Sequence, residues 1–249
     1  MAKKYFCWNV DDGLEEDKRI VKLLREYGMG ATFNLNAGMF GKKGMIGRIG
    51  NLGIKDVTLD QYKKSWHILK YCEHFRIPAD EVQQVYQGFE IASHGYRHEN
   101  LKKISEKEAA ESIHNDVKAL SARFHQNIRG FAYPYGAFTE AAILELQKAG
   151  ICYARTIERA TSFEKPADPM RTPMNGWHID KDIMQKLDDF ICTEAKENDL
   201  FFLMFAHGYE FTFNTKESNW DKFKRICDTV ASRDDIICCS TAEALGGKI

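Results

Sequence analysis

The chain has 249 residues, of which 44% are hydrophobic and 29% are charged, and its formal net charge is −1 at pH 7. Such a composition is typical of a globular protein with its own core, and the near-zero charge gives no reason to expect nucleic acid as a partner. The seven cysteines are irregularly spaced without a C-x-x-C pair, so we expect free thiols. No apolar signal segment opens the sequence and no stretch is long enough to cross a membrane, which predicts a cytoplasmic protein with no membrane partner.

Predicted strands and helices alternate along the chain. The expected strands cover residues 5–10, 31–35, 89–92, 130–133, 151–155, 200–206 and 236–239. The expected helices cover residues 15–27, 105–124, 139–149, 180–196 and 220–232, with a short one after residue 240. The alternation favours parallel pairing, and we predict an α/β fold, a distorted barrel of about seven parallel strands, built as a single domain over residues 1–249.

Residues 38–88 are predicted to be an insertion in this barrel. A glycine occurs at every third position from Gly38 to Gly53, among several lysines and arginines. Two helices are expected next, one over residues 59–75 and one after Pro78. The glycine stretch is either a flexible connection or a mobile basic lid over the site.

Polar side chains follow four of the predicted strands. Asp11 and Asp12 end the first, His94 and His98 follow the third, and Tyr135 and His207 follow two later ones. The carboxyl ends of parallel barrel strands meet at one rim, so these groups should lie together. On a helical turn, the spacing H-x-x-x-H would place both imidazoles on one face. Two histidines and one carboxylate form a three-ligand metal site with an open position, while a second carboxylate can act as a base.

These motifs resemble those of the polysaccharide deacetylase family, the NodB-homology fold of carbohydrate esterases. The opening D-D-G motif matches Asp11-Asp12-Gly13, and the H-[ST]-x-x-H motif matches the spacing from His94 to His98, with Gly95 in place of the hydroxyl residue. The R-x-P-Y motif matches Pro134-Tyr135, and the late L-x-H motif resembles the sequence ending at His207. The motifs occur in the family's order along nearly the whole chain.

The resemblance implies a role for each site residue. Asp12, His94 and His98 would hold one divalent metal ion, zinc by default, although cobalt, nickel or iron also suit such ligands. Asp11 would be the general base, and His207 the general acid that protonates the leaving amine. The backbone N–H of Tyr135 would help to bind the oxyanion.

Two departures from the family pattern concern one ion pair. Ala132 stands where the R-x-P-Y arginine would orient the base, and the D-W motif keeps Trp177 without its aspartate. Losing both partners of an ion pair costs less than leaving one buried and unpaired, which favours a divergent member. Arg155 or Arg171 could replace the arginine, and His178 could add a polar group near the site. We predict that Trp177, Pro134 and Tyr135 contact the substrate. For Trp177, a purely structural role as a core or rim aromatic is an equally good interpretation.

The leading hypothesis is a metal-dependent hydrolase that removes acetyl groups from N-acetylated, or O-acetylated, sugars. One alternative is an amidohydrolase acting on a small non-sugar amide or imide, which a cytoplasmic location favours. The other is a catalytically silent carbohydrate-binding relative, which the missing arginine favours. The expected partner is therefore an acetylated carbohydrate or a small amide.

Overall fold

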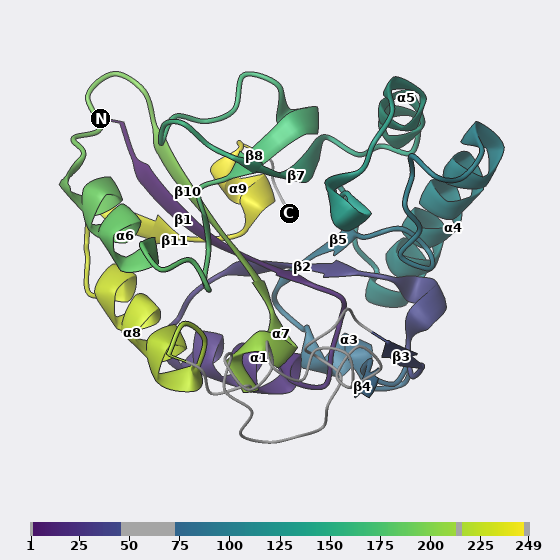
Figure 1. Cartoon of the computed structure of the whole chain (residues 1–249), viewed down its shortest axis with the longest axis horizontal. Coiled ribbons are helices and arrows are strands. Elements are labelled where there is room, and N and C mark those ends of the chain that lie inside the picture. The colour runs from purple at the N-terminus through teal and green to yellow at the C-terminus, as the bar shows by residue number, and fades with distance from the viewer. Residues whose placement is uncertain (1, 46–72, 213–215, 247–249) are drawn as a thin grey trace, which may run out of the picture.

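The computed structural model describes residues 2–45, 73–212 and 216–246, and nine strands in these ranges form one parallel barrel-like sheet (Figure 1). Its hydrogen-bonded order is β8-β7-β6-β5-β2-β1-β10-β9, with β11 paired to β1. These strands are β1 (Lys4–Asp11), β2 (Ala31–Leu35), β5 (Glu90–Ser93), β6 (Gly130–Ala132), β7 (Tyr153–Arg159), β8 (Thr172–Met174), β9 (Gly176–Trp177), β10 (Leu200–His207) and β11 (Ile236–Cys238). The prediction of a distorted parallel barrel is confirmed.

The strand count differs from the prediction because the sheet has nine strands rather than about seven. The two additional strands, β8 and β9, lie within residues 172–177, at the end of a segment that shows no strand periodicity in the sequence. Each is an end strand of the pairing order and at most three residues long. Strands this short, one of them containing Pro173, are too brief for an alternating pattern to reveal.

Strand β1 shows how the sheet divides its side chains between two faces. Phe6, Trp8 and Val10 belong to the large core shared with the surrounding helices, whereas Cys7 belongs to a smaller cluster with inward residues of β10. Asn9 bonds to Asn34 and Thr241 inside the barrel. Because side chains alternate along a strand, Asp11 belongs to this interior face, at the carboxyl end of β1.

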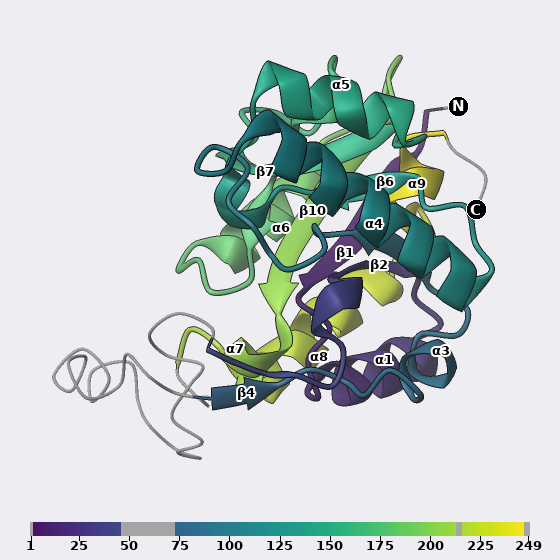
Figure 2. The same cartoon turned by 90° about the vertical axis from the view of Figure 1, so that its right-hand side faces the viewer.

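Helices cover the outer face of the sheet, except for the last one in the chain, which lies at its interior (Figures 1 and 2). They are α1 (Asp17–Glu26), α3 (Val82–Val85), α4 (Glu106–Phe124), α5 (Glu140–Lys148), α6 (Ile183–Cys192), α7 (Gly208–Thr212), α8 (Trp220–Ala231) and α9 (Thr241–Ala244). Ser105 and Glu108 form a capping box at the start of α4. Helix α9 lies in the middle of the ring in Figure 1, where its buried Thr241 bonds to Asn9. None of the helices in the described ranges is both long and apolar enough to cross a membrane.

The predicted insertion is described only at its two ends. Strands β3 (Lys43–Met45) and β4 (Glu73–Phe75) pair antiparallel, so the helix predicted over residues 59–75 is wrong at its last three residues. The rest of that helix, and the glycine stretch beyond residue 45, lie outside the described residues. The helix expected after Pro78 is a single turn, α3. Figure 2 shows β10 pointing toward α7, with β4 beside it, so the hairpin lies at the carboxyl end of the strands.

Candidate metal and catalytic site

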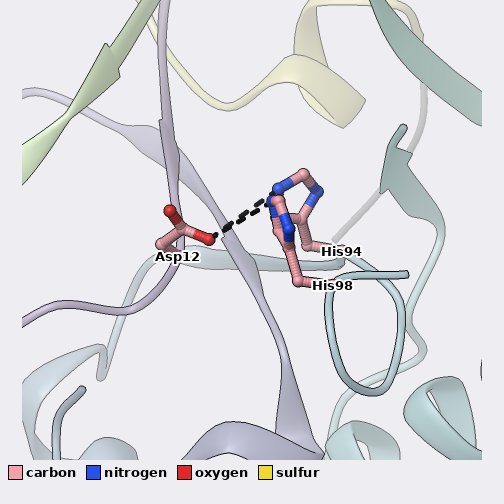
Figure 3. A group of neighbouring side chains, drawn as sticks. All are labelled: Asp12, His94 and His98. Carbon is pink, nitrogen blue, oxygen red and sulfur yellow. Dashed lines mark ion pairs between the residues drawn. The ribbon is translucent and has the colours of Figure 1, made fainter. Parts of the chain in front are cut away.

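The three predicted metal ligands converge at this end of the barrel. The ligand atoms of Asp12, His94 and His98 all lie within 4.8 Å of one another (Figure 3). Asp12 Oδ1 lies 4.0 Å from Nε2 of His94 and 3.7 Å from Nε2 of His98. Asp12 and His94 are buried, whereas the side chain of His98 is 21% exposed. This arrangement leaves the ligand set open on one side, as a catalytic ion requires.

The chain reaches these positions through an unusual backbone. Asp12 and His98 have positive φ angles of 81° and 60°, as does Tyr135 at 60°. Such conformations are costly for residues other than glycine and concentrate at functional sites. The two histidines were predicted to lie on a helical turn, and this is wrong: Gly95 has a φ of 73°, and the segment is a turn that ends in the left-handed His98. The two imidazoles nevertheless face the same carboxylate.

His94 is held in the state that a metal ligand needs. Its Nδ1 lies 2.7 Å from the carbonyl oxygen of Ala132, which leaves Nε2 unprotonated and directed toward Asp12. Burial lowers the pKa of His94 to about 4, so the ring is neutral near pH 7. Behind the ring, buried Asp116 accepts hydrogen bonds from Ser93 Oγ and from the backbone N–H of His94. One carboxylate and two imidazoles, of which His94 is neutral, therefore fit a divalent ion of the zinc type.

Asp11 lies next to this ligand set and is clamped by two side chains. Asn34 Nδ2 donates a hydrogen bond to Asp11 Oδ1 at 2.7 Å, and the guanidinium of Arg155 forms a short ion pair with Asp11 Oδ2. Arg155 is fully buried, and in the sheet register it is the partner of Ala132. The arginine missing from β6 is thus supplied by the neighbouring strand β7. Arg171, the other candidate, pairs with Glu140 at the surface instead.

His207 faces the ligand set from β10, where the register pairs it with Asp11. Its Nε2 lies 3.9 Å from Asp12 Oδ2, and its Nδ1 lies 3.2 Å from Oε1 of Glu210, a buried residue on α7. Burial alone would lower the pKa of His207, but the carboxylate of Glu210, together with those of Asp12 and Asp11, outweighs burial and raises the pKa to about 9. His207 is therefore cationic near pH 7 and able to donate a proton.

Sequence analysis did not identify Glu210, although its place three residues after His207 was a signal. Besides pairing with His207, it accepts hydrogen bonds from the backbone N–H of His207 and from Trp177 Nε1, both at 3.0 Å. His178 lies behind it, fully buried, with Nε2 2.8 Å from Ser218 Oγ. Glu210 thus supplies a buried carboxylate to His207 and Trp177 from a position outside the family motifs.

A further unpredicted residue, Arg76, contacts the metal ligand Asp12. Its Nη2 lies 3.2 Å from Asp12 Oδ1, and its Nε donates a hydrogen bond to the Asp12 carbonyl oxygen at 3.1 Å. The residue is 5% exposed. It follows β4 directly, within the predicted insertion, where no sequence pattern linked it to the site.

These groups form the floor of a pocket of about 420 Å³ with largely apolar and aromatic walls. Trp177 and Tyr135, both predicted to contact the substrate, line this pocket; Tyr135 is 62% exposed and packs edge-on against the His98 ring. Pro134 is buried under its turn. The pocket is lined by Asp11, Asp12, Arg76, His94, His98, Tyr133, Tyr135, Arg155, Ile157, Arg159, Met174, Trp177, Phe205, His207 and Tyr209.

The chain is similar to one protein family and to several solved structures. The model of the family described as polysaccharide deacetylase matches residues 1–154. No curated protein matches this chain. Among solved structures, the family 4 carbohydrate esterase from Streptomyces lividans is 13% identical with a TM-score of 0.56; the match covers 99% of this chain and 97% of that one. The Xyl-CE4 domain of a multidomain xylanase from the hindgut metagenome of Trinervitermes trinervoides is 13% identical with a TM-score of 0.56. The match covers 98% of this chain and 90% of that one.

A third similar structure is BA3943 from Bacillus anthracis, described as a CE4 family pseudoenzyme. It is 16% identical with a TM-score of 0.53, and the match covers 98% of this chain and 66% of that one. At these identities the comparisons show only that the fold is shared. Both a carbohydrate esterase and a pseudoenzyme have this fold.

Proposed function

This chain belongs to the polysaccharide deacetylase family, and we propose that it is a metal-dependent hydrolase that removes acetyl groups from N-acetylated sugars. The observation that carries the proposal is the placement of Asp11 and His207 beside the Asp12, His94 and His98 ligand set. A base and an acid adjoining one open metal site are what hydrolysis of an amide needs.

A divalent ion held by the three ligands would polarise the amide carbonyl and make a coordinated water more acidic. Asp11 takes the proton of the attacking water on its carboxylate, which Asn34 and Arg155 hold in place. The water oxygen bonds to the acetyl carbon, and the backbone N–H of Tyr135 stabilises the negative charge that develops on the carbonyl oxygen.

His207 completes the reaction by protonating the leaving nitrogen. Its Nδ1 faces Glu210, so the proton to be donated is on Nε2, the atom nearer Asp12. The C–N bond breaks as this proton is transferred, and the products are acetate and a free amine. Glu210 keeps His207 oriented and cationic before the transfer.

The walls of the pocket support a carbohydrate as the substrate. Trp177 and Tyr135 offer ring faces of the kind on which sugars pack, with Pro134 shaping the turn below Tyr135. The pocket volume of about 420 Å³ suits a compact ligand. A small non-sugar amide is therefore the second candidate, because Ile157 and Met174 add apolar wall that a sugar does not require.

Acetate release tests the proposal. The zinc-loaded protein is incubated with N-acetylated mono- and oligosaccharides, O-acetylated sugars, and small non-sugar amides and imides. We expect acetate from the N-acetylated sugars, loss of activity after chelation, and recovery when zinc is restored. Turnover confined to the non-sugar compounds supports the second candidate. Absence of turnover, with zinc bound and the fold intact, indicates a silent relative.

A further inference from the structure

We propose that Arg76 tunes the metal site by competing with the ion for the Asp12 carboxylate, so that the ion is held less tightly than the three ligands alone would allow. The inference rests on the proposed function only in requiring that a divalent ion occupies the site. It identifies a residue outside the motifs that sets metal affinity.

Arg76 contacts the carboxylate oxygen of Asp12 that faces the other ligands. Arg76 Nη2 lies 3.2 Å from Oδ1 of Asp12, and this is the same oxygen that lies closest to Nε2 of His98. The oxygen that would donate to the ion is therefore already paired with a guanidinium. Both side chains are buried, at 5% and 3% side-chain exposure, so water screens the interaction little.

Arg76 also brings a permanent positive charge to the site, because arginine is cationic at every pH that the protein experiences. Placing a permanent positive charge against a ligand oxygen withdraws negative charge from the ion and repels it directly.

Arg76 also bonds to the Asp12 backbone, and that contact could favour metal binding by ordering the ligand. The turn, however, has other supports: Asp12 N–H donates to the Asn34 carbonyl at 3.0 Å, and Ile77 N–H donates to the Gly13 carbonyl at 2.9 Å. These backbone bonds stay when the guanidinium is removed. We therefore expect the loss of charge to dominate.

The test compares zinc affinity, measured by competition with a chromogenic chelator, in the wild type and in Arg76→Met. We expect the variant to bind zinc about tenfold more tightly, because a cation that repels the ion is removed from a buried site. Arg76→Lys keeps a cation and should stay close to the wild type. Arg159→Met is the matched control, because Arg159 lines the same pocket but pairs with Asp180; its zinc affinity should change less than threefold, on the order of the context-dependent variation in such contacts.

Unchanged or weaker zinc binding by a folded Arg76→Met variant overturns the inference. If circular dichroism shows that this variant does not fold, zinc affinity is measured in Arg76→Gln, which keeps an N–H donor for the Asp12 carbonyl. The same outcomes then support or overturn the inference. A wild type that binds no zinc or other divalent ion contradicts the proposed metal dependence itself. Zinc binding without acetate release removes the proposed activity but leaves the effect of Arg76 measurable.

Discussion

The site has two halves that differ in how they relate to the family motifs. One half, at the ends of β1 and β5, contains Asp11, Asp12, His94 and His98, and its residues follow the expected spacing. The other half, on β7, β9, β10 and α7, keeps His207 and Trp177 but obtains its supporting charges from new positions. The comparison indicates that the groups proposed to touch the reacting atoms stay in place, whereas the groups that orient them can come from other elements.

The largest effect is expected in the half that follows the motifs. In a double variant with His94→Ala and His98→Ala, only Asp12 remains of the ligand set, so the protein should bind no ion and release no acetate. Elemental analysis after dialysis measures the metal, and circular dichroism should show an intact fold because the core lies elsewhere. A metal content equal to that of the wild type would disprove the site.

The next effect separates the base from the ligands. Asp11→Asn keeps the size of the side chain and its contact with Arg155, but removes proton acceptance. Turnover at saturating zinc should fall by roughly 10²–10⁴, while the zinc content stays near that of the wild type. The corresponding control is Asn34→Ala, which removes a partner of Asp11 and leaves its carboxylate in place. Full turnover by Asp11→Asn would rule out the proposed base.

A swap between strands sharpens the comparison between the two halves. Arg155→Ala leaves buried Asp11 without its cation, and we expect a loss of about 3–5 kcal/mol in the free energy of unfolding together with reduced turnover. Adding Ala132→Arg restores a guanidinium at the register partner of position 155. The double variant should therefore recover part of both losses, as urea unfolding and acetate release would measure. A double variant no better than Arg155→Ala would show that the two positions are not equivalent.

The smallest effect concerns Glu210, which acts through His207. Glu210→Gln removes the charge that raises the pKa of His207 to about 9, so this pKa should fall toward or below its ordinary value. His207 then loses its proton at lower pH, and the alkaline limb of the activity profile moves downward, with about a tenfold loss of turnover at pH 8. Proton NMR of the metal-free variant measures the pKa independently. Glu217→Gln, which changes a partly exposed acidic residue nearby in sequence, is the control.

The parts of the fold that repeat a pattern could be predicted from the sequence. Alternating strands and helices indicated the parallel barrel, and strand ends that carry Asp11 and His94 indicated where the site lies. The strands β8 and β9 were missed because two or three residues carry no period. Contacts such as that of Arg76 with Asp12 depend on how the chain returns to the barrel after an insertion, which spacing alone does not determine.

The supporting charges could be predicted only as a set of alternatives. Arg155 and Arg171 were equal candidates in the sequence, and the register that pairs position 155 with Ala132 distinguishes them. Glu210 belongs to no recognised motif. Its side chain contacts His207 because the short helix α7 follows His207 directly. Side chains that act through another residue are thus harder to find than the ligands themselves.

The pairing of Ala132 with Arg155 has a consequence for the evolution of this fold. Register partners on adjacent parallel strands have side chains on the same face, separated by about 5 Å. An arginine can therefore arise on one strand before it disappears from the other, and no ancestor needs to have carried an unpaired base. Lineages that descend from such an intermediate would keep a supported base while they lose the arginine of the R-x-P-Y motif. Motif loss in one strand is then a reason to inspect its neighbour before a homologue is classed as inactive.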